Sequence, residues 1–208
     1  MTHPFAPLME EHRLIDRVND AFEGWAARAV RRGDGSDSKD REELLRFVGF
    51  LQRFVDTRHH DKEEATVFRV MREHGLLDQK DSVRGLIEEH EQSRTLLFEL
   101  ERLAHQPDIW TVQDRQRLLR MVRSYVALMY RHTTKEDTVV FPLAKARLPS
   151  RAMAKVRAEL GVVDDDEVDP VIPPDPEREL GERLAAAHRP VSEPRFIPGY
   201  SAKRTATR

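Results

Sequence analysis

The chain has 208 residues, of which 39% are apolar and 35% charged, and its 35 basic and 37 acidic residues give a formal net charge of −2, a profile that predicts one globular domain plus a shorter additional segment. Because it contains no cysteine, disulfides, thiolate metal sites and thiol nucleophiles are excluded, and any metal would have to be held by nitrogen and oxygen atoms. No apolar run approaches the ~18–20 residues that span a bilayer, no secretory signal opens the chain and no long basic block occurs in the first 150 residues, so we expect a cytoplasmic protein that binds neither membrane nor nucleic acid.

Four long helices are predicted between Phe5 and Ala146, where leucine, valine and phenylalanine recur at spacings of three and four residues. Breaks that combine glycine, proline and small polar residues lie at residues 31–40, 74–82 and 105–111. The predicted helices cover residues 8–30, 40–73, 82–104 and 112–146. Because the connections are short, consecutive helices are expected to run antiparallel, which predicts an all-α, up-down-up-down four-helix bundle.

The segment after the bundle has a different composition. A helix-compatible piece over residues 151–160 precedes an acidic, proline-rich linker, and a second helical fragment over residues 177–188 precedes a basic tail. We therefore predict a bundle domain over residues 1–149 and a partly disordered C-terminal extension over residues 150–208. The narrow apolar stripe of the second fragment predicts loose docking at most. A role of the tail in binding a protein partner stays open.

Two sequence motifs each occur twice along the predicted helices. LMEEH from Leu8 and LIEEH from Leu86 share the leucine, both glutamates and the histidine. HHDKEEATVF from His59 and HTTKEDTVVF from His132 share the first histidine, the lysine, the glutamate after it, the last valine and the phenylalanine. The pattern indicates a duplicated helical hairpin, in which the first helix carries a lone histidine and the second a His-x-x-x-Glu pair.

The spacing within the His-x-x-x-Glu pairs is suited to binding a metal. Residues four apart on a helix lie on the same face with their Cβ atoms roughly 6 Å apart, so one ion can contact both side chains. Four histidines and two carboxylates are too many ligands for a single ion, and the carboxylates are suited to bridging a metal pair. Without a cation, this set would be a poorly compensated polar cluster in a bundle core.

The adjacent residues His59 and His60 point about 100° apart on an α-helix, so only one of them can face the bundle interior. Val55 lies beside His59 on a helical wheel, whereas Asp56 and Arg53 flank His60. His59 is therefore expected inside and His60 on the polar face. The histidines predicted to be surface residues are His3, His60, His74, His105 and His188.

These motifs resemble those of the hemerythrin-like, or HHE cation-binding, domains over about residues 5–146. The resemblance is carried by EEH at Glu10–His12, HHDKEEATVF from His59, EEHEQ from Glu88 and HTTKEDTVVFP from His132. It implies a four-helix bundle that holds two non-haem iron ions, and we expect an oxo or hydroxo bridge between them. The iron ligands that it implies are His12, His59, Glu63, His90, His132 and Glu136.

The sequence departs from the oxygen-carrying hemerythrins at two positions. The carriers have a second histidine four residues after the third-helix one, where this chain has Arg94. They also have an aspartate five residues after the last histidine, so Asp137 competes with Glu136 as the last ligand, although the repeat favours Glu136. With one imidazole fewer, each iron is expected to keep an open position. Arg94 is expected either to pair with Asp16 beside the site or to form an ordinary surface salt bridge.

These features predict a protein that binds dioxygen, nitric oxide or peroxide at a di-iron centre. The leading hypothesis extends to turnover of the bound molecule. Whether the chain is an enzyme stays open, although a peroxidase- or catalase-like activity, or one directed at nitric oxide, would fit. One alternative is an iron- or oxygen-responsive regulatory module that signals to a partner through the C-terminal extension. Another is the storage or donation of iron for metalloprotein repair.

Overall fold

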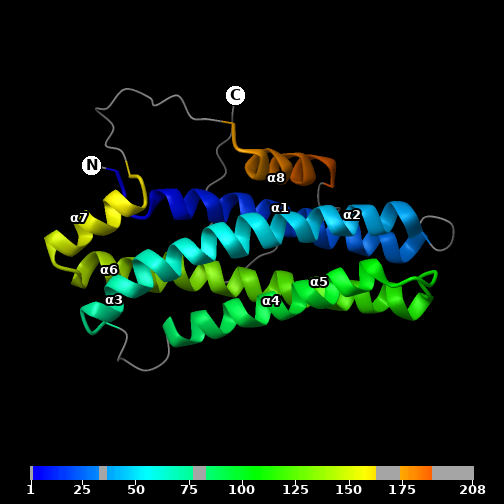
Figure 1. The fold of residues 1–208 in the computed structure, drawn as a ribbon, viewed down its shortest axis with the longest axis horizontal. Coiled ribbons are helices and arrows are strands. Elements are labelled where there is room, and N and C mark those ends of the chain that lie inside the picture. Colours follow the sequence, from blue (N-terminus) through cyan, green and yellow to red (C-terminus); the bar gives the residue numbers. More distant parts are fainter. Residues whose placement is uncertain (1, 33–36, 77–82, 163–173, 189–208) are drawn as a thin grey trace.

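The computed structural model describes residues 2–32, 37–76, 83–162 and 174–188, and all regular secondary structure within these ranges is helical. Four rods form the bundle (Figure 1). The first rod is α1 (Ala6–Arg32), and the third is α4 (Val83–His105). The second rod consists of α2 (Asp37–Phe50), η1 (Leu51–His60), η2 (Glu63–Phe68) and α3 (Arg69–Glu73). The fourth rod consists of α5 (Val112–Lys135), η3 (Glu136–Val140) and α6 (Phe141–Arg147). The segments η1, η2 and η3 are π-helical. Two shorter helices follow, α7 (Ser150–Glu159) and α8 (Pro176–Ala187).

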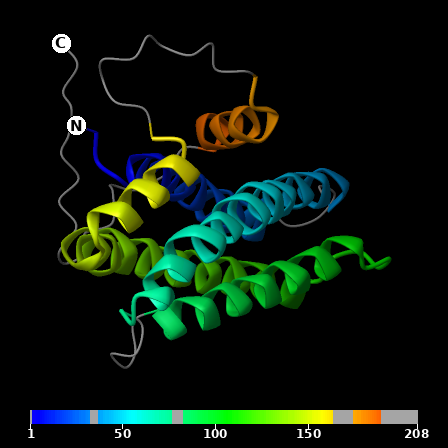
Figure 2. The ribbon, with the colours of Figure 1, turned by 60° about the vertical axis from the view of Figure 1, so that its left-hand side comes forward.

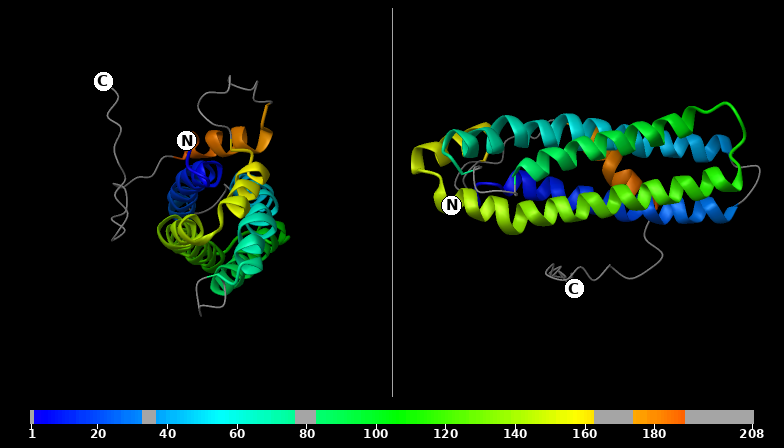
Figure 3. Two further views of the ribbon diagram at one scale, coloured as in Figure 1. Left: turned by 90° about the vertical axis from the view of Figure 1, so that its left-hand side faces the viewer. Right: turned by 90° about the horizontal axis from the view of Figure 1, so that it is seen from below.

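The rods pack in the predicted up-down-up-down arrangement. The first rod lies against the fourth, the fourth against the third, the third against the second, and the second again against the first. Seen along the bundle axis, they surround a common interior (Figure 3). The predicted all-α, up-down-up-down four-helix bundle is thus confirmed. None of the helices in the described ranges is long and apolar enough to cross a membrane.

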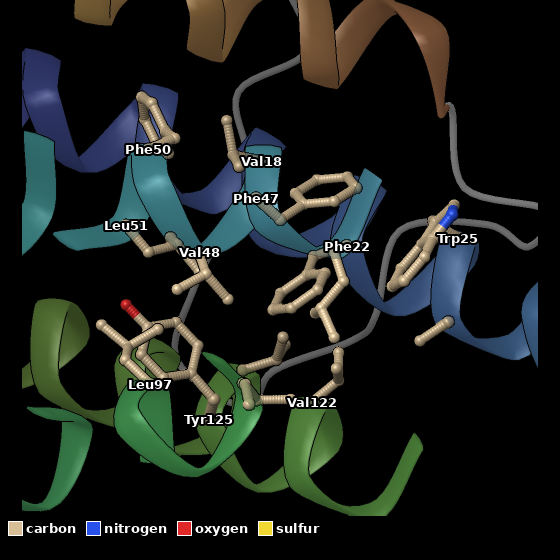
Figure 4. Packing of buried hydrophobic residues seen from close by; sticks show 14 of the residues in the cluster. Val18, Phe22, Trp25, Phe47, Val48, Phe50, Leu51, Leu97, Val122 and Tyr125 are labelled. Atoms are coloured by element: carbon tan, nitrogen blue, oxygen red, sulfur yellow. The ribbon is translucent and has the colours of Figure 1, made fainter. Parts of the chain in front are cut away.

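The interior of the bundle contains two separate apolar clusters. The large apolar cluster runs from Leu14 to Ala29 on α1 and takes in the facing parts of the other rods, and Figure 4 shows its stacked Phe22 and Phe47 rings. The small apolar cluster lies nearer the other end and includes Phe5 and Phe141. Along every rod, buried polar side chains lie between these clusters. The fold therefore holds a polar layer between two apolar blocks.

A buried arginine fastens the bundle end opposite the small apolar cluster. Thr111 and Asp114 form a capping box that begins α5, and Arg115 follows directly. The Arg115 guanidinium donates to the Asp40 carboxylate at 2.8 Å and to the Ala29 carbonyl at 3.0 Å. Because these bonds connect α5 with α1 and α2, they fix the register of three rods.

The two helices of the predicted extension both pack on the bundle (Figure 2). α7 adds Ala152 and Val156 to the small apolar cluster, and α8 buries Leu184 completely in the large one. Gly181 of α8 packs close to the Phe50 ring. The expectation that α8 docks loosely at most is therefore wrong: its stripe is narrow, but a glycine lets it approach the bundle closely.

The remaining predictions for the extension fall on other parts of the chain. Most of the acidic, proline-rich linker and the whole basic tail, residues 163–173 and 189–208, lie outside the described residues. Their predicted disorder stays a prediction, as does the domain boundary at residue 149.

Candidate metal centre

The six side chains predicted to bind metal come together in the buried layer between the two apolar clusters. α1 and α4 each place one histidine there, and the second and fourth rods each place one histidine and, four residues later, one glutamate. All six residues are at most 2% exposed. The residues of this polar layer are His12, His59, Glu63, His90, His132 and Glu136.

One half of the polar layer is built around His12 and His59. Their Nε2 atoms lie 3.0 Å apart. The His12 Nε2 is 3.3 Å from Glu136 Oε2 and 3.6 Å from Glu63 Oε1, and the His59 Nε2 is 3.4 Å from the same Glu63 oxygen. Ligand atoms of these four residues all lie within 4.8 Å of one another, so one ion could contact them all.

The other half of the polar layer repeats this geometry. The Nε2 atoms of His90 and His132 lie 3.1 Å apart. The His90 Nε2 is 3.7 Å from Glu63 Oε2, and the His132 Nε2 is 3.3 Å from Glu136 Oε2. Glu63 and Glu136 therefore belong to both groups and lie between the two histidine pairs. The arrangement suits two ions connected by two carboxylates.

The unsatisfied polar atoms of this layer fit a pair of cations. All four carboxylate oxygens of Glu63 and Glu136 are buried and make no hydrogen bond with any residue that the structure describes, which is costly for charged groups in a bundle core. The two contacts between Nε2 atoms also need a positive charge. Two unprotonated imidazole nitrogens at about 3 Å repel each other unless a proton or a metal cation lies between them. The donor set is of the nitrogen and oxygen type that iron accepts.

Four further carboxylates hold the outward nitrogens of the histidines. In each case an imidazole Nδ1–H donates to a carboxylate oxygen, which leaves the Nε2 lone pair directed inward. The pairs are His12 with Asp137 at 2.8 Å, His59 with Glu11 at 2.8 Å, His90 with Glu64 at 2.7 Å and His132 with Glu89 at 3.0 Å.

Sequence reasoning considered Asp137 only as an alternative metal ligand and assigned no role to the other three outer carboxylates, although the repeat contained a signal for two of them. Glu11 and Glu89 directly precede the lone histidine in the two copies of the EEH motif. The lysines that precede the inner glutamates complete the pattern, because Lys62 donates to Glu11 at 2.6 Å and Lys135 donates to Glu89 at 2.8 Å. The shared lysine and glutamate positions thus mark one hydrogen-bonded unit in each hairpin.

The electrostatics around His12 and Glu136 favour their charged forms, whereas burial, together with the neighbouring His132, lowers the pKa of His90. Burial lowers the pKa of His12, but the carboxylates of Asp137, Glu136 and Glu63 outweigh it and raise this pKa well above its ordinary value. For Glu136, burial alone would raise the pKa, yet the neighbouring imidazoles hold this pKa well below its usual range. The pKa of Glu11 is lowered to about 2, because the bonds from its imidazole and lysine partners outweigh burial.

The two candidates for the last carboxylate lie in different places. Glu136 is fully buried within both groups, whereas the side chain of Asp137 is 19% exposed and bonds to the outward nitrogen of His12. Of the two arrangements expected for Arg94, the pairing with Asp16 is not found, and Arg94 forms salt bridges with other carboxylates. Arg94 instead donates to Asp56 at 2.7 Å.

His60, predicted to be a surface residue, is fully buried, so that prediction is wrong. Its ring stacks on His90, with ring centroids 3.8 Å apart. The error arose because the wheel assumed an α-helix through His59 and His60, whereas both residues end the π-helical segment η1. A π-helical turn contains more residues, so adjacent side chains are separated by less than 100° and both can face inward.

Comparisons with known proteins are consistent with this geometry. Residues 3–144 match the family described as the hemerythrin HHE cation binding domain. The chain is also 26% identical over 135 residues to an uncharacterized protein of Mycobacterium bovis and to uncharacterized proteins of two strains of Mycobacterium tuberculosis. These matches cover 65% of this chain and 51% of each relative, so the chain spans about half the length of the curated relatives it matches. No solved structure matches the chain.

Proposed function

The chain belongs to the hemerythrin HHE cation binding domain family, and from this premise we propose that its polar layer holds two non-haem iron ions that bind and turn over a small oxidant or diatomic molecule. Dioxygen, nitric oxide and hydrogen peroxide are the candidate ligands. The observation that carries the proposal is the placement of Glu63 and Glu136, whose unsatisfied oxygens lie between two histidine pairs.

In this proposal His12 and His59 hold one ion, His90 and His132 hold the other, and the two glutamates contact both. When bound, an iron pair supplies Lewis-acidic and redox-active positions for a small molecule. An oxo or hydroxo bridge between the ions stays a prediction.

The residues around the polar layer would orient the ligands and exclude water. The Nδ1–H bonds to the outer carboxylates fix the ring tautomers and increase the basicity of the inward nitrogens. The apolar clusters close the layer on both sides along the bundle axis. Because all six residues are at most 2% exposed, a molecule larger than a few atoms would have to open the bundle to reach them.

The test is an anaerobic iron titration followed by optical spectra after addition of dioxygen, nitric oxide or peroxide. We expect two irons per chain and a spectral change with at least one ligand. A double variant, His59→Ala with Glu63→Ala, should lose iron, whereas the exposed control His105→Ala should not. A double variant that still binds two irons with unchanged affinity would refute the assignment.

A regulatory role is the second candidate, because a contact connects α8 with the outer carboxylates. Arg58 donates to Asp175, the N-cap of α8, at 2.5 Å, and its Nε lies 3.8 Å from Glu11. Glu11 in turn holds His59. If iron occupancy is reported through this contact, deleting residues 163–208 should abolish the response of a partner while leaving iron binding intact. Unchanged signalling after the deletion would exclude this role.

A further inference from the structure

His60 is a fifth buried imidazole beside the polar layer, and it differs from the other four in its bonding. The residue is 0% exposed, and within the described ranges of the chain neither ring nitrogen makes a hydrogen bond. A buried imidazole without hydrogen bonds is costly unless its environment supplies another partner. His60 therefore has unused capacity to bind a ligand at the edge of the candidate site.

The position of His60 directs this capacity toward one half of the layer. Its ring stacks on His90 at 3.8 Å and meets His132 edge-on, with ring centroids 5.4 Å apart. One ring nitrogen of His60 lies within 4.8 Å of ligand atoms of both residues. The Nδ1 of His60 is also 3.6 Å from Asp56 Oδ1, so a carboxylate faces this ring as carboxylates face the other four.

The internal repeat shows that the other half of the layer has no equivalent imidazole. The residue that aligns with His60 in the second copy of the motif is Thr133. Thr133 is buried, but its hydroxyl donates to the Met129 carbonyl at 3.1 Å within its own helix. The sequence difference between the two copies therefore makes the two halves chemically unequal.

We propose that His60 is a ligand of the metal ion held by His90 and His132, so that this ion has three imidazoles and the ion at His12 and His59 has two. The inference rests on the proposed two-metal function. It also revises the expectation of an open position on each iron.

Arg94 would support this arrangement from outside. It donates to Asp56, the carboxylate that faces His60, and its Nη2 lies 3.3 Å from Glu64, which holds His90. Arg94 thus keeps in place the two carboxylates behind the stacked rings. It would act as a positioning residue and not as a ligand.

The first test is the variant His60→Thr, which gives both copies of the motif the same residue. In a metal titration of the full chain we expect one of the two ions to bind at least tenfold more weakly and the other to be unchanged. His105→Thr, at an exposed site, is the matched control. Both ions binding as tightly as in the unmodified chain would overturn the proposal.

A second variant distinguishes the loss of a metal ligand from a general loss of structure. His60→Phe retains a ring that can stack on His90 but cannot bind metal, and removing a buried group without hydrogen bonds should not destabilise the metal-free protein. We expect this variant to fold and to show the same selective weakening of one ion. Full retention of both ions would contradict the inference.

The unmodified chain provides an independent measurement. In the Co²⁺-substituted protein, each ligating imidazole contributes one exchangeable, hyperfine-shifted N–H resonance. Five such resonances are expected, and four would overturn the role of His60 while leaving the two-metal proposal intact. Failure of the unmodified chain to bind two ions would instead refute the proposed function and this inference together.

Discussion

At the residue scale, the histidines of the polar layer use their two ring nitrogens for different tasks. The outward nitrogen donates to a carboxylate and the inward nitrogen stays free for a cation. Glu11 is one of these carboxylates. It accepts hydrogen bonds from both His59 and Lys62, and only 3% of the residue is exposed.

Replacing Glu11 by glutamine should weaken metal binding about 10- to 100-fold, because the outer carboxylate orients His59 and increases its basicity. Competition with a chelator would measure the loss. Its neighbour Glu10, whose side chain is 59% exposed, offers the control, since Glu10→Gln should leave the affinity unchanged. Equal affinities for the two variants would mean that the contact with His59 has no effect on metal binding.

Asp16 should make the stability of the metal-free protein depend on pH. Burial raises its pKa to about 7 from an ordinary value of 3.8, and its Oδ1 has no hydrogen-bond partner among the described residues. Because the folded pKa is the higher one, the folded protein loses stability as the pH rises from about 4 to about 7. Asp16→Asn removes this cost. The free energy of unfolding of the variant, relative to that of the unmodified protein, should therefore rise by up to about 1.4 kcal/mol per pH unit across this window.

Denaturant unfolding at several pH values would check this prediction. The variant Asp61→Asn, at an exposed position, serves as the control for removing one charge. A difference between Asp16→Asn and the unmodified protein that stays constant from pH 4 to pH 7 would contradict it.

The sequence was sufficient to identify the six residues of the polar layer, because they recur at fixed spacing in both hairpins. It was not sufficient for His60. Its orientation depends on π-helical hydrogen bonding in η1, which no side-chain pattern reveals. Two of the outer carboxylates, Glu11 and Glu89, are identical residues in the two copies of the repeat. The partners of the outer carboxylates lie on other helices, however, and the spacing in a single sequence cannot specify contacts between helices.

At the element scale, the docking of α8 depends on a single glycine. A Cβ atom at Gly181 would lie 2.5 Å from the Phe50 ring and 3.3 Å from Leu14. Alanine is the better helix former by about 1 kcal/mol, so propensity and packing predict opposite effects of Gly181→Ala. Because the Phe50 ring is buried and stacked on Phe54, we expect packing to dominate.

We therefore predict that Gly181→Ala lowers the free energy of unfolding by about 1–3 kcal/mol. Gly85 in α4 is the matched control, because a Cβ there would meet only the Lys135 Nζ, at 3.9 Å. Gly85→Ala should leave stability unchanged or raise it. Two alanine variants of equal stability would show that α8 is not packed closely on the bundle.

The fold of α8 illustrates why element boundaries were easier to predict than packing. Its helical fragment was expected over residues 177–188 and is found at Pro176–Ala187. Its close packing was missed because Leu180, Leu184 and Ala187 form only a narrow stripe in sequence. The stripe can be buried because Gly181 lies beside it. This fit between α8 and the bundle can be recognised only when both surfaces are known.

At the scale of the whole molecule, the polar layer links metal binding to folding. The layer lies between the two apolar clusters and takes side chains from all four rods, so unfolding would separate the residues that could hold the metal. Removing metal should therefore lower the melting temperature. At a free metal concentration 100-fold above Kd, each independent site should contribute about 2.7 kcal/mol.

Thermal scans with and without a chelator would measure this difference. The double variant His59→Ala with Glu63→Ala should respond much less to metal than the unmodified chain. A melting temperature unaffected by chelator in the unmodified, metal-loaded protein would contradict the linkage.

Each hairpin has one outer carboxylate that bonds to its own histidine and one that bonds to a histidine of the other hairpin, and this has a consequence for the assembly of the molecule. Glu11 and Glu89 hold histidines of their own hairpin, whereas Glu64 holds His90 and Asp137 holds His12 across the boundary between hairpins. Each half completes the other reciprocally, as the two subunits of a symmetric dimer do. Fragments comprising residues 1–76 and 83–162, produced as separate chains, should therefore recombine, and the shared ions should act as the clasp that sets their affinity.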